Sequence, residues 1–185
     1  MTRKVVASTY ITLDGFIDEP GMWSFPFWCE EAIQFKPKEL WDSDAQLLGR
    51  LTYEGFAAAW PTMEGTGEFG EKMNTMPKYV ASRTLETATW NATIIKGDVA
   101  ERVRELKQED GGDLLIGGSG QLIDYLTAHD LIDEYRLMIC PIVLGDGTMR
   151  LFNGVPRRTF TLVDTLIFPT GVVVNTYHPA AAPAA

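Results

Sequence analysis

Residues 114–126, LLIGGSGQLIDYL, pass from an apolar run through three glycines within four positions into a second apolar pattern. The first three residues are typical of a buried strand. After the glycines, Leu122, Ile123 and Leu126 recur at the spacing of one helical face, and Ser119 stands where a helix N-cap is expected. The stretch predicts a strand, a tight turn and a helix, which is the repeating unit of an α/β fold.

The strand signal recurs along the whole chain. Strands are expected at residues 4–13, 45–49, 78–82, 93–96, 113–118, 134–144, 159–168 and 171–178. Helical patterns lie between the earlier strands, at 29–41, 50–60 and 98–110, whereas the last three strands follow one another directly. This order predicts an α/β sandwich whose sheet is mostly parallel with an antiparallel edge.

Three residues are expected to shape these helices. Pro37 should interrupt or bend the first helix, and Pro61 should end the second. Asp98 should cap the third, with Glu101 completing a capping box.

Length and composition predict one compact domain over residues 1–178. The chain has 185 residues, 45% of them hydrophobic, which is enough for one sizeable core. Residues 179–185, PAAAPAA, have nothing to bury and are expected to be disordered.

The net charge of −9 argues against nucleic acid or an anionic membrane as a partner, because both would repel the molecule. No apolar run approaches the roughly 18 residues of a membrane span. Cys29 and Cys140 stand far apart, which is typical of inert thiols in a reducing compartment. We therefore expect a cytoplasmic protein.

The glycine loop stands at the end of a predicted strand and the start of a helix, where α/β proteins bind ligands. Glycines there let backbone N–H groups approach an oxyanion, and a helix N-terminus favours negative charge. GGSG is neither a GxGxxG nor a Walker A sequence, so a plain turn is the alternative.

A second strand end carries Gly49 and Arg50, followed by Thr52. The guanidinium is a fork for phosphate, and the threonine adds a hydroxyl in the first helical turn. The alternative is a surface pair between Arg50 and Glu54.

A third strand end carries Ser82 and Arg83, a pair suited to a phosphate monoester, or else an ordinary solvated turn. Three such strand ends in an acidic chain suggest an elongated ligand with several phosphates.

An aromatic segment, GMWSFPFWCEE, adds an apolar wall beside carboxylates. Trp23, Phe27 and Trp28, with Glu30 and Glu31, could form a pocket for a flat heterocycle, although such residues more often fill a core.

The sequence gives little support to a metal site or to nucleophilic catalysis. His129 and His178 lack the neighbours of a metal site, and no PCxxC motif of a zinc deaminase is present. No GxSxG elbow or Cys-His pair for nucleophilic catalysis is apparent either. We expect no metal site.

In order along the chain, the segments TLDGFID, LLGRLTYEGF, KYVASRTL, LLIGGSGQLI and LIDEYRLMICPIVLGDGTMRLF resemble the reductase domain of riboflavin-biosynthesis deaminase-reductase proteins. That family shares its fold with dihydrofolate reductase. The resemblance runs from about Lys4 to Tyr177. It implies a three-layer sandwich around an eight-stranded mixed sheet, NADPH as hydride donor, and a homodimer.

The resemblance also assigns site residues. Those implied for the cofactor are Ile17, Gly49, Arg50, Leu51, Thr52, Ser82, Arg83, Lys96, Gly117, Gly118, Ser119, Gly120 and Gln121. Of these, Ser82 and Arg83 would meet the adenosine 2′-phosphate, with added charge from Lys96.

Two departures separate the chain from the riboflavin enzymes. Their Glu before the paired glycines is replaced by Ile116, and the deaminase half is absent, which indicates a stand-alone member. The expected acid of dihydrofolate reductase has no clear counterpart. Asp14 is the candidate proton source, with a water or Tyr53 as alternatives, and Glu30 or Glu31 could also serve as the acid.

The sequence thus predicts an NADPH-dependent reductase that passes a hydride to a C=N or C=O bond of a small, pterin- or pyrimidine-like substrate. The alternative is a dimeric nucleotide-binding module that does not catalyse. A third hypothesis is a structural interaction domain, in which an exposed strand near residues 134–143 pairs across a dimer.

Overall fold

In the computed structural model, which describes residues 3–180, eight strands form one mixed sheet. The strands are β1 (Val5–Thr12), β2 (Ser43–Gly49), β3 (Lys78–Ala81), β4 (Ala92–Ile95), β5 (Asp113–Gly117), β6 (Glu134–Cys140), β7 (Phe160–Ile167) and β8 (Val173–Pro179). Their order across the sheet is β4-β3-β2-β5-β1-β6-β8-β7. The first six pair in parallel, and β8 and β7 are antiparallel, which confirms the predicted strands and sheet.

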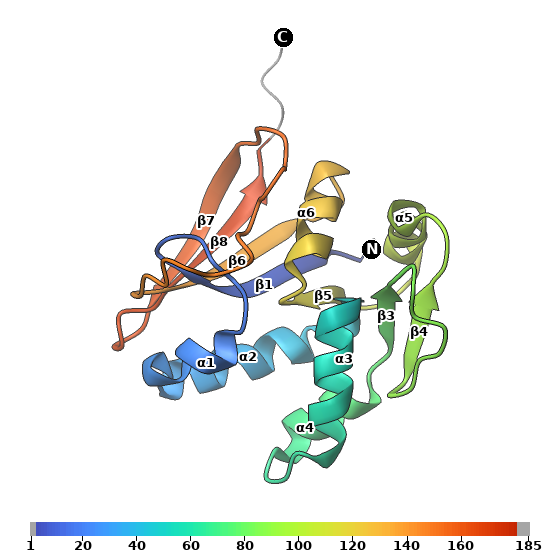
Figure 1. Ribbon diagram of the computed structural model, residues 1–185, viewed down its shortest axis with the longest axis horizontal. Helices are drawn as coiled ribbons and strands as arrows, with labels where there is room; N and C mark the ends of the chain where they lie inside the picture. The colour runs from blue at the N-terminus through green and yellow to red at the C-terminus, as the bar shows by residue number, and fades with distance from the viewer. Residues whose placement is uncertain (1–2, 181–185) are drawn as a thin grey trace.

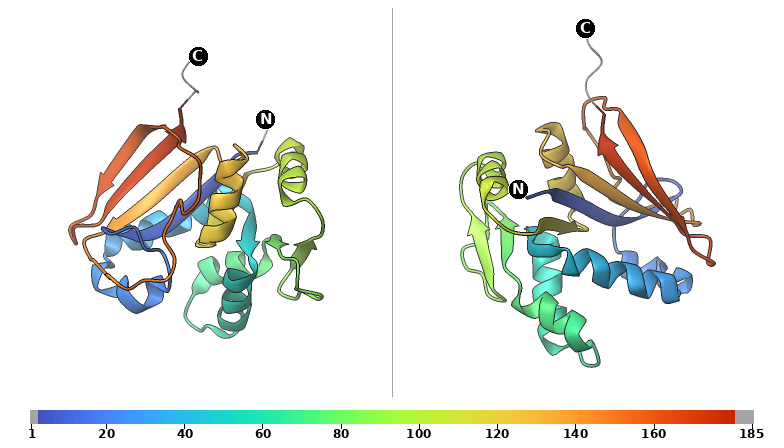
Figure 2. Two further views of the ribbon diagram at one scale, coloured as in Figure 1. Left: turned by 45° about the horizontal axis from the view of Figure 1, so that its top comes forward. Right: turned by 180° about the vertical axis from the view of Figure 1, so that it is seen from behind.

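Helices cover both faces of the sheet (Figures 1 and 2). They are α1 (Pro20–Trp23), α2 (Glu30–Trp41), α3 (Arg50–Ala59), α4 (Gly67–Thr75), α5 (Val99–Gln108) and α6 (Gly120–Ala128), with short 3-10 turns at Phe25–Phe27 and Trp60–Thr62. Helices α5 and α6 pack on one face, and α1 to α4 pack on the other. The result is the predicted three-layer α/β sandwich.

Alternate residues of the central strands face opposite layers because side chains alternate along a strand. Val5 and Ala7 of β1 belong to the large core under α5 and α6, whereas Val6 packs in a smaller core with Leu40 of α2. Ser8, two residues beyond Val6, therefore lies on the α2 side of the sheet. This polar residue in a buried strand helps to form the site described below.

Helices α2 and α4 differ from expectation. Helix α2 continues through Pro37, and the missing N–H falls opposite the carbonyl of Ile33, an exposed residue that water can reach. Helix α4 was not expected, because Gly67 and Gly70 have low helix propensity. The predicted cap at Asp98 is confirmed, since its carboxylate accepts a hydrogen bond from the Glu101 N–H at 3.1 Å.

The predicted exposed strand near residues 134–143 was wrong. Strand β6 is internal and pairs with β1 and β8, so it cannot pair with a second molecule. The edge strands are β4 and β7, and β7 is the more exposed of the two, with seven of its eight residues exposed.

The ordered chain also extends past the predicted boundary at residue 178. Strand β8 includes Pro179, and the Ala180 N–H donates to the Thr159 carbonyl at 3.0 Å. The rest of the predicted disordered tail, 181–185, lies outside the described residues. Within 3–180, the helices are all too short or too polar to cross a membrane.

Candidate active site

A long cleft opens at the carboxyl ends of the parallel strands and continues over the sheet between α2 and α3. Its volume is about 2290 Å³, whereas a pocket for one small ligand holds roughly 300–1,000 Å³. The cleft therefore has room for an extended ligand and a second molecule. Such a position, outside the carboxyl ends of the strands, is where open α/β sheets bind ligands.

The glycine loop between β5 and α6 forms one wall of this cleft. Gly118 has φ +63°, in the left-handed region that suits glycine, and Ser119 also has positive φ, +55°. A Cβ on Gly120 would lie 2.3 Å from Cδ1 of Ile17 and 2.8 Å from the Met149 sulfur, so a larger residue there would have to displace both side chains. Backbone N–H groups at the start of α6 have no partner within the helix and are available to an anion.

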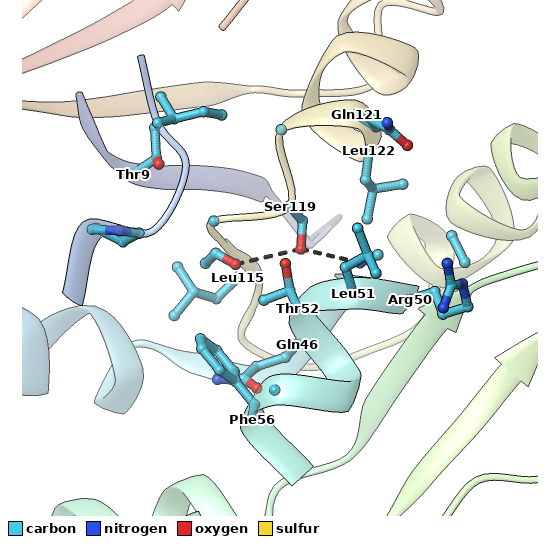
Figure 3. Close-up of a pocket in the computed structure, with 18 of the residues that line it drawn as sticks. Thr9, Gln46, Arg50, Leu51, Thr52, Phe56, Leu115, Ser119, Gln121 and Leu122 are labelled. Carbon is cyan, nitrogen blue, oxygen red and sulfur yellow. Dashed lines mark hydrogen bonds between the residues drawn. The ribbon is translucent and has the colours of Figure 1, made fainter. Parts of the chain in front are cut away.

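Ser119 links the glycine loop to the start of α3. Its hydroxyl accepts a hydrogen bond from the Gly49 N–H at 3.0 Å and donates to the Gly117 carbonyl at 3.4 Å (Figure 3). The prediction that this side chain caps α6 was wrong, because the left-handed backbone turns it toward β2. Two of the three predicted strand ends are thus joined directly.

The first turn of α3 places Arg50, Leu51 and Thr52 in the cleft. Arg50 forms the ion pair with Glu54 that was the alternative interpretation, at 2.9 Å, but both side chains stay about two-fifths exposed. The same arginine can therefore both pair with Glu54 and face a ligand.

The third strand end lies farther along the same cleft. The Ser82 hydroxyl accepts from the N–H groups of Thr84 and Leu85, at 3.2 and 2.9 Å, and so closes its own turn. Arg83 and Lys96 both line the cleft, are exposed, and have no ionic partner within 3–180. Two unpaired cations in a chain of net charge −9 provide the local positive charge that a phosphate requires.

These observations fit a dinucleotide phosphate. All thirteen residues that the family resemblance implied for the cofactor line this one cleft. A glycine loop with left-handed backbone at Gly118 and Ser119, two helix N-termini and three cationic side chains are groups that hold a pyrophosphate and a further phosphate.

The aromatic segment is divided between the cleft and the core. Trp28 lines the cleft and stacks on Tyr10, with 6.4 Å between ring centroids. Trp23 is buried and donates its Nε1–H to the Asp18 carbonyl at 2.9 Å, and Phe27 packs in the same apolar cluster. Trp23 and Phe27 therefore fill the core, which was the alternative to a role in a ligand pocket.

Glu30 and Glu31 lie outside the cleft lining, exposed on the first turn of α2. Glu30 accepts a hydrogen bond from Gln34 at 3.2 Å, an ordinary contact on a helix surface. Neither carboxylate is positioned against a ligand.

Asp14 also lies outside the cleft lining. Its carboxylate accepts hydrogen bonds from the Thr12 hydroxyl at 2.6 Å and from the N–H groups of Gly145 and Leu144 at 2.8 and 3.3 Å. The Thr12 hydroxyl, followed by these N–H groups, lowers the pKa of Asp14 to about 2. The residue anchors the 140s loop and is poorly suited to donate a proton.

Tyr53 is the buried residue of α3. Its hydroxyl accepts from the Thr89 N–H at 2.8 Å and lies 3.3 Å from the Thr89 carbonyl, to which it donates. Tyr53 thus fixes the loop after β3 and does not reach the cleft.

A buried polar cluster that sequence reasoning missed lies in the cleft between β1 and α2. The Lys36 ammonium donates to the Ser8 hydroxyl at 2.7 Å and to Glu39 Oε2 at 2.9 Å, and Ser8 donates to the same oxygen at 2.9 Å. Glu39 is 2% exposed, while the Lys36 side chain is 21% exposed. A lysine amine has three protons, so one N–H remains for a ligand.

Two further residues complete this cluster. The Lys36 ammonium lies 5.1 Å from the Tyr10 ring centroid, and the Arg136 guanidinium lies 3.5 Å from Glu39 Oε1 on the side away from Lys36. Burial and the nearby Glu39 raise the pKa of Tyr10, so this phenol stays protonated. The cluster can therefore position a proton beside the middle of β1.

The sequence held a weak signal for this cluster. Lys36 and Glu39 are three residues apart on a helix, which is typical of an exposed ion pair, and only the topology places Ser8 beside them. A serine at an inward position of the apolar strand β1 was the available clue. Clusters of three or more His, Cys, Asp or Glu side chains that could hold a metal are absent from residues 3–180.

Comparisons with known proteins identify the family. Residues 3–174 match the RibD C-terminal domain. The chain belongs to that family. It is 30% identical over 180 residues to the uncharacterised protein YyaP of Bacillus subtilis (strain 168), a match that covers 95% of each chain.

Two solved structures share the fold over nearly the whole chain. A protein of Shewanella sp. PV-4 named for riboflavin biosynthesis superposes with a TM-score of 0.77 at 20% identity, covering 98% of this chain and 100% of the other. Dihydrofolate reductase of Enterococcus faecalis, in complex with NADP(H) and RAB-propyl, superposes with a TM-score of 0.67 at 15% identity and the same coverage. The predicted dihydrofolate-reductase-like fold is confirmed.

Proposed function

We propose that this protein is an NADPH-dependent reductase that transfers a hydride to a C=N or C=O bond of a small, pterin- or pyrimidine-like heterocycle. Membership of the RibD C-terminal domain family supports the reductase class. The finer assignment depends on one observation in the cleft. The glycine loop and the Lys36–Ser8–Glu39 cluster are adjacent, because Ser8 of β1 is the register partner of Gly117, the last residue of β5 before the loop.

This adjacency suits a hydride transfer. The nicotinamide would supply the hydride when bound, and the protein must hold the acceptor beside it and provide a proton. Lys36 lies within the cleft against Ser8 of β1, the strand beside the one that leads into the glycine loop. Its remaining N–H can polarise or protonate the nitrogen or oxygen of the acceptor. Glu39 and Ser8 hold the amine in place for that step.

The cationic end of the cleft supports NADPH over NADH. The two cofactors differ by the adenosine 2′-phosphate, and Arg83 and Lys96 would contact this group. Hydrogen bonds to charged groups are worth about 1.5–3 kcal/mol, so we expect NADPH to bind at least about tenfold more tightly than NADH.

Thermal denaturation with each cofactor tests this assignment. A ligand at 100 times its Kd stabilises the folded state by about 2.7 kcal/mol, which for a chain of this length raises Tm by roughly 5–10 °C. NADPH should give that shift at concentrations where NADH gives little, and Arg83→Ala should remove most of the difference. Arg104→Ala, on the exposed side of α5 and outside the cleft, is the matched control.

Equal shifts with NADPH and NADH would overturn the assignment of Arg83. No shift with either would overturn the dinucleotide site. Tight NADPH binding without oxidation of NADPH by any acceptor in a pterin, pyrimidine and quinone panel would support the non-catalytic nucleotide-binding module instead.

The exposed edge strand β7 supports a homodimer. Leu162, Val163, Leu166 and Ile167 are each at least 41% exposed, and an open edge with apolar side chains is suited to pairing with a second copy. Cys29 and Cys140 are free thiols, which agrees with a cytoplasmic location.

A further inference from the structure

The cleft has a branch that the cofactor residues do not use. It runs between α2, α3 and α4 and ends at Gln46, in the middle of β2. Its walls are aromatic or sulfur-containing side chains together with two leucines: Leu40, Phe56, Trp60, Met63, Phe69, Met73 and Leu115. Figure 3 shows the Gln46 side chain beside Phe56, in the part of the cleft beyond Thr52.

Gln46 is an exception in this apolar branch. It is 3% exposed, and its Oε1 is the one buried side-chain oxygen or nitrogen within 3–180 that has no hydrogen-bond partner. Its Nε2 donates to the Met73 sulfur at 3.1 Å, which fixes the amide orientation because the sulfur can only accept. The oxygen is left as an unpaired acceptor in a residue that lines the cleft.

A buried acceptor without a partner destabilises the fold, and a leucine or valine would suit β2 better. The neighbouring strand β3 does not supply a donor for this oxygen. Lys78, the register partner of Gln46 on β3, directs its ammonium to the Met73 carbonyl and to the Trp90 ring, 4.0 Å from its centroid. The missing partner of Gln46 is therefore a donor from outside the chain.

We propose that this branch binds a flat, uncharged aromatic heterocycle that donates an N–H to Gln46 Oε1. The aromatic walls favour a planar ring. The acceptor selects a ring N–H or an aromatic amino group, and the buried ammonium of Lys78 nearby disfavours a cationic ligand.

The proposal rests on the proposed function in one respect, namely that this heterocycle is part of the molecule to be reduced. Gln46 is the register partner of Leu115, and Leu115 stands two residues before Gly117 of the glycine loop. Two residues of a strand span about 7 Å, the length of a two-ring heterocycle. A ligand anchored on Gln46 thus extends toward the Ser8 and Gly117 position, where the hydride and the proton are supplied.

Indole and benzofuran test the acceptor directly. The two fragments have the same fused-ring shape, but only indole carries an N–H donor. NMR titration of protein labelled at the methionine methyl groups reports where they bind, through Met63 and Met73. We expect indole to shift both signals and to bind about tenfold more tightly than benzofuran.

Variants then attribute the preference to one side chain. Gln46→Met keeps the length of the side chain without the acceptor and should bring the affinities of indole and benzofuran to within about twofold of each other. Gln108→Met, at the exposed end of α5, is the matched control and should retain the wild-type preference. If Gln46→Met does not fold, the comparison of indole with benzofuran on the wild-type protein still tests the proposal.

The outcomes separate this inference from the reductase proposal. Equal or tighter binding of benzofuran by the wild type, or indole shifts that avoid Met63 and Met73, overturns the inference even if NADPH binds. Donor-selective indole binding in a protein whose Tm does not respond to NADPH supports the Gln46 site and overturns the reductase assignment.

Discussion

Removing the Ser119 hydroxyl should loosen the contact between the glycine loop and the start of α3, the two halves of the proposed cofactor site. Ser119→Ala leaves the Gly49 N–H without its 3.0 Å acceptor at the start of α3. An unsatisfied, partly buried donor costs about 1–2 kcal/mol, and each kcal/mol shifts Tm by about 2–4 °C in a chain of this size. We therefore expect Tm to fall by roughly 2–8 °C.

The same change should weaken NADPH binding. Without the Ser119 contact, the glycine loop must be ordered when the ligand binds, at a cost of about 0.5–1.5 kcal/mol for each immobilised group. Isothermal titration calorimetry should then give a Kd for NADPH that is raised by roughly 2- to 10-fold.

Two variants separate these effects from ordinary loss of a serine. Ser43→Ala removes a hydroxyl that donates to the Glu39 carbonyl at 2.8 Å, outside the cleft, so stability should fall while NADPH affinity stays unchanged. Ser119→Gly loses the same hydrogen bond as Ser119→Ala but suits the positive φ of this position, so its Tm should lie between those of wild type and Ser119→Ala. A Ser119→Ala protein with the Tm and the NADPH affinity of wild type would refute the reasoning.

Three further predictions test the proton source, the 140s loop and the open edge. Lys36→Met should lower kcat by about 10²- to 10⁴-fold, with whichever panel acceptor the wild type reduces, and should leave the Kd for NADPH unchanged; Lys38→Met, on the exposed side of α2, should change neither value. Asp14→Asn should lower Tm relative to the wild type at neutral pH. Because the folded-state pKa of Asp14 lies below the usual 3.8, the difference in Tm between the two proteins should disappear as pH falls from about 4 through 2. A difference that stays constant down to pH 2 would contradict the anchoring role of Asp14. Ile167→Lys, at a β7 side chain that is 74% exposed, should convert a dimer to a monomer in light scattering, and an unchanged mass would exclude this edge as the interface.

The architecture could be predicted because its signals are local. Each strand is an apolar run bounded by polar or glycine residues. Asp98 is the N-cap of α5, and its hydrogen-bond partner, Glu101, is only three residues away. Helix α4 escaped prediction because Gly70 stands in its middle. The structure explains that glycine, since a Cβ there would lie 1.9 Å from the Thr66 hydroxyl oxygen.

The residues that the resemblance implied for the cofactor follow strand ends in short motifs, and the structure brings them together in one cleft. The polar cluster was not predictable, because Ser8 and Lys36 come together only through the packing of α2 on β1, a contact between residues 28 positions apart. Asp14 illustrates the opposite error. Its motif drew attention to a carboxylate whose partners, Leu144 and Gly145, lie 130 and 131 residues away and could not be identified from spacing.

The arrangement of the cleft has an evolutionary consequence. The glycine loop and the strand-end cations lie at the carboxyl ends of β2 to β5 and at the starts of α3 and α6. The inner branch is lined instead by α2, α4, the later part of α3 and Gln46, which lies farther back on β2. Substitutions in that inner branch can change which ring fits without altering the residues that are proposed to face the phosphates. Under the proposed function, one scaffold can therefore accept a new substrate after a few changes in the inner branch, while it keeps the same hydride donor.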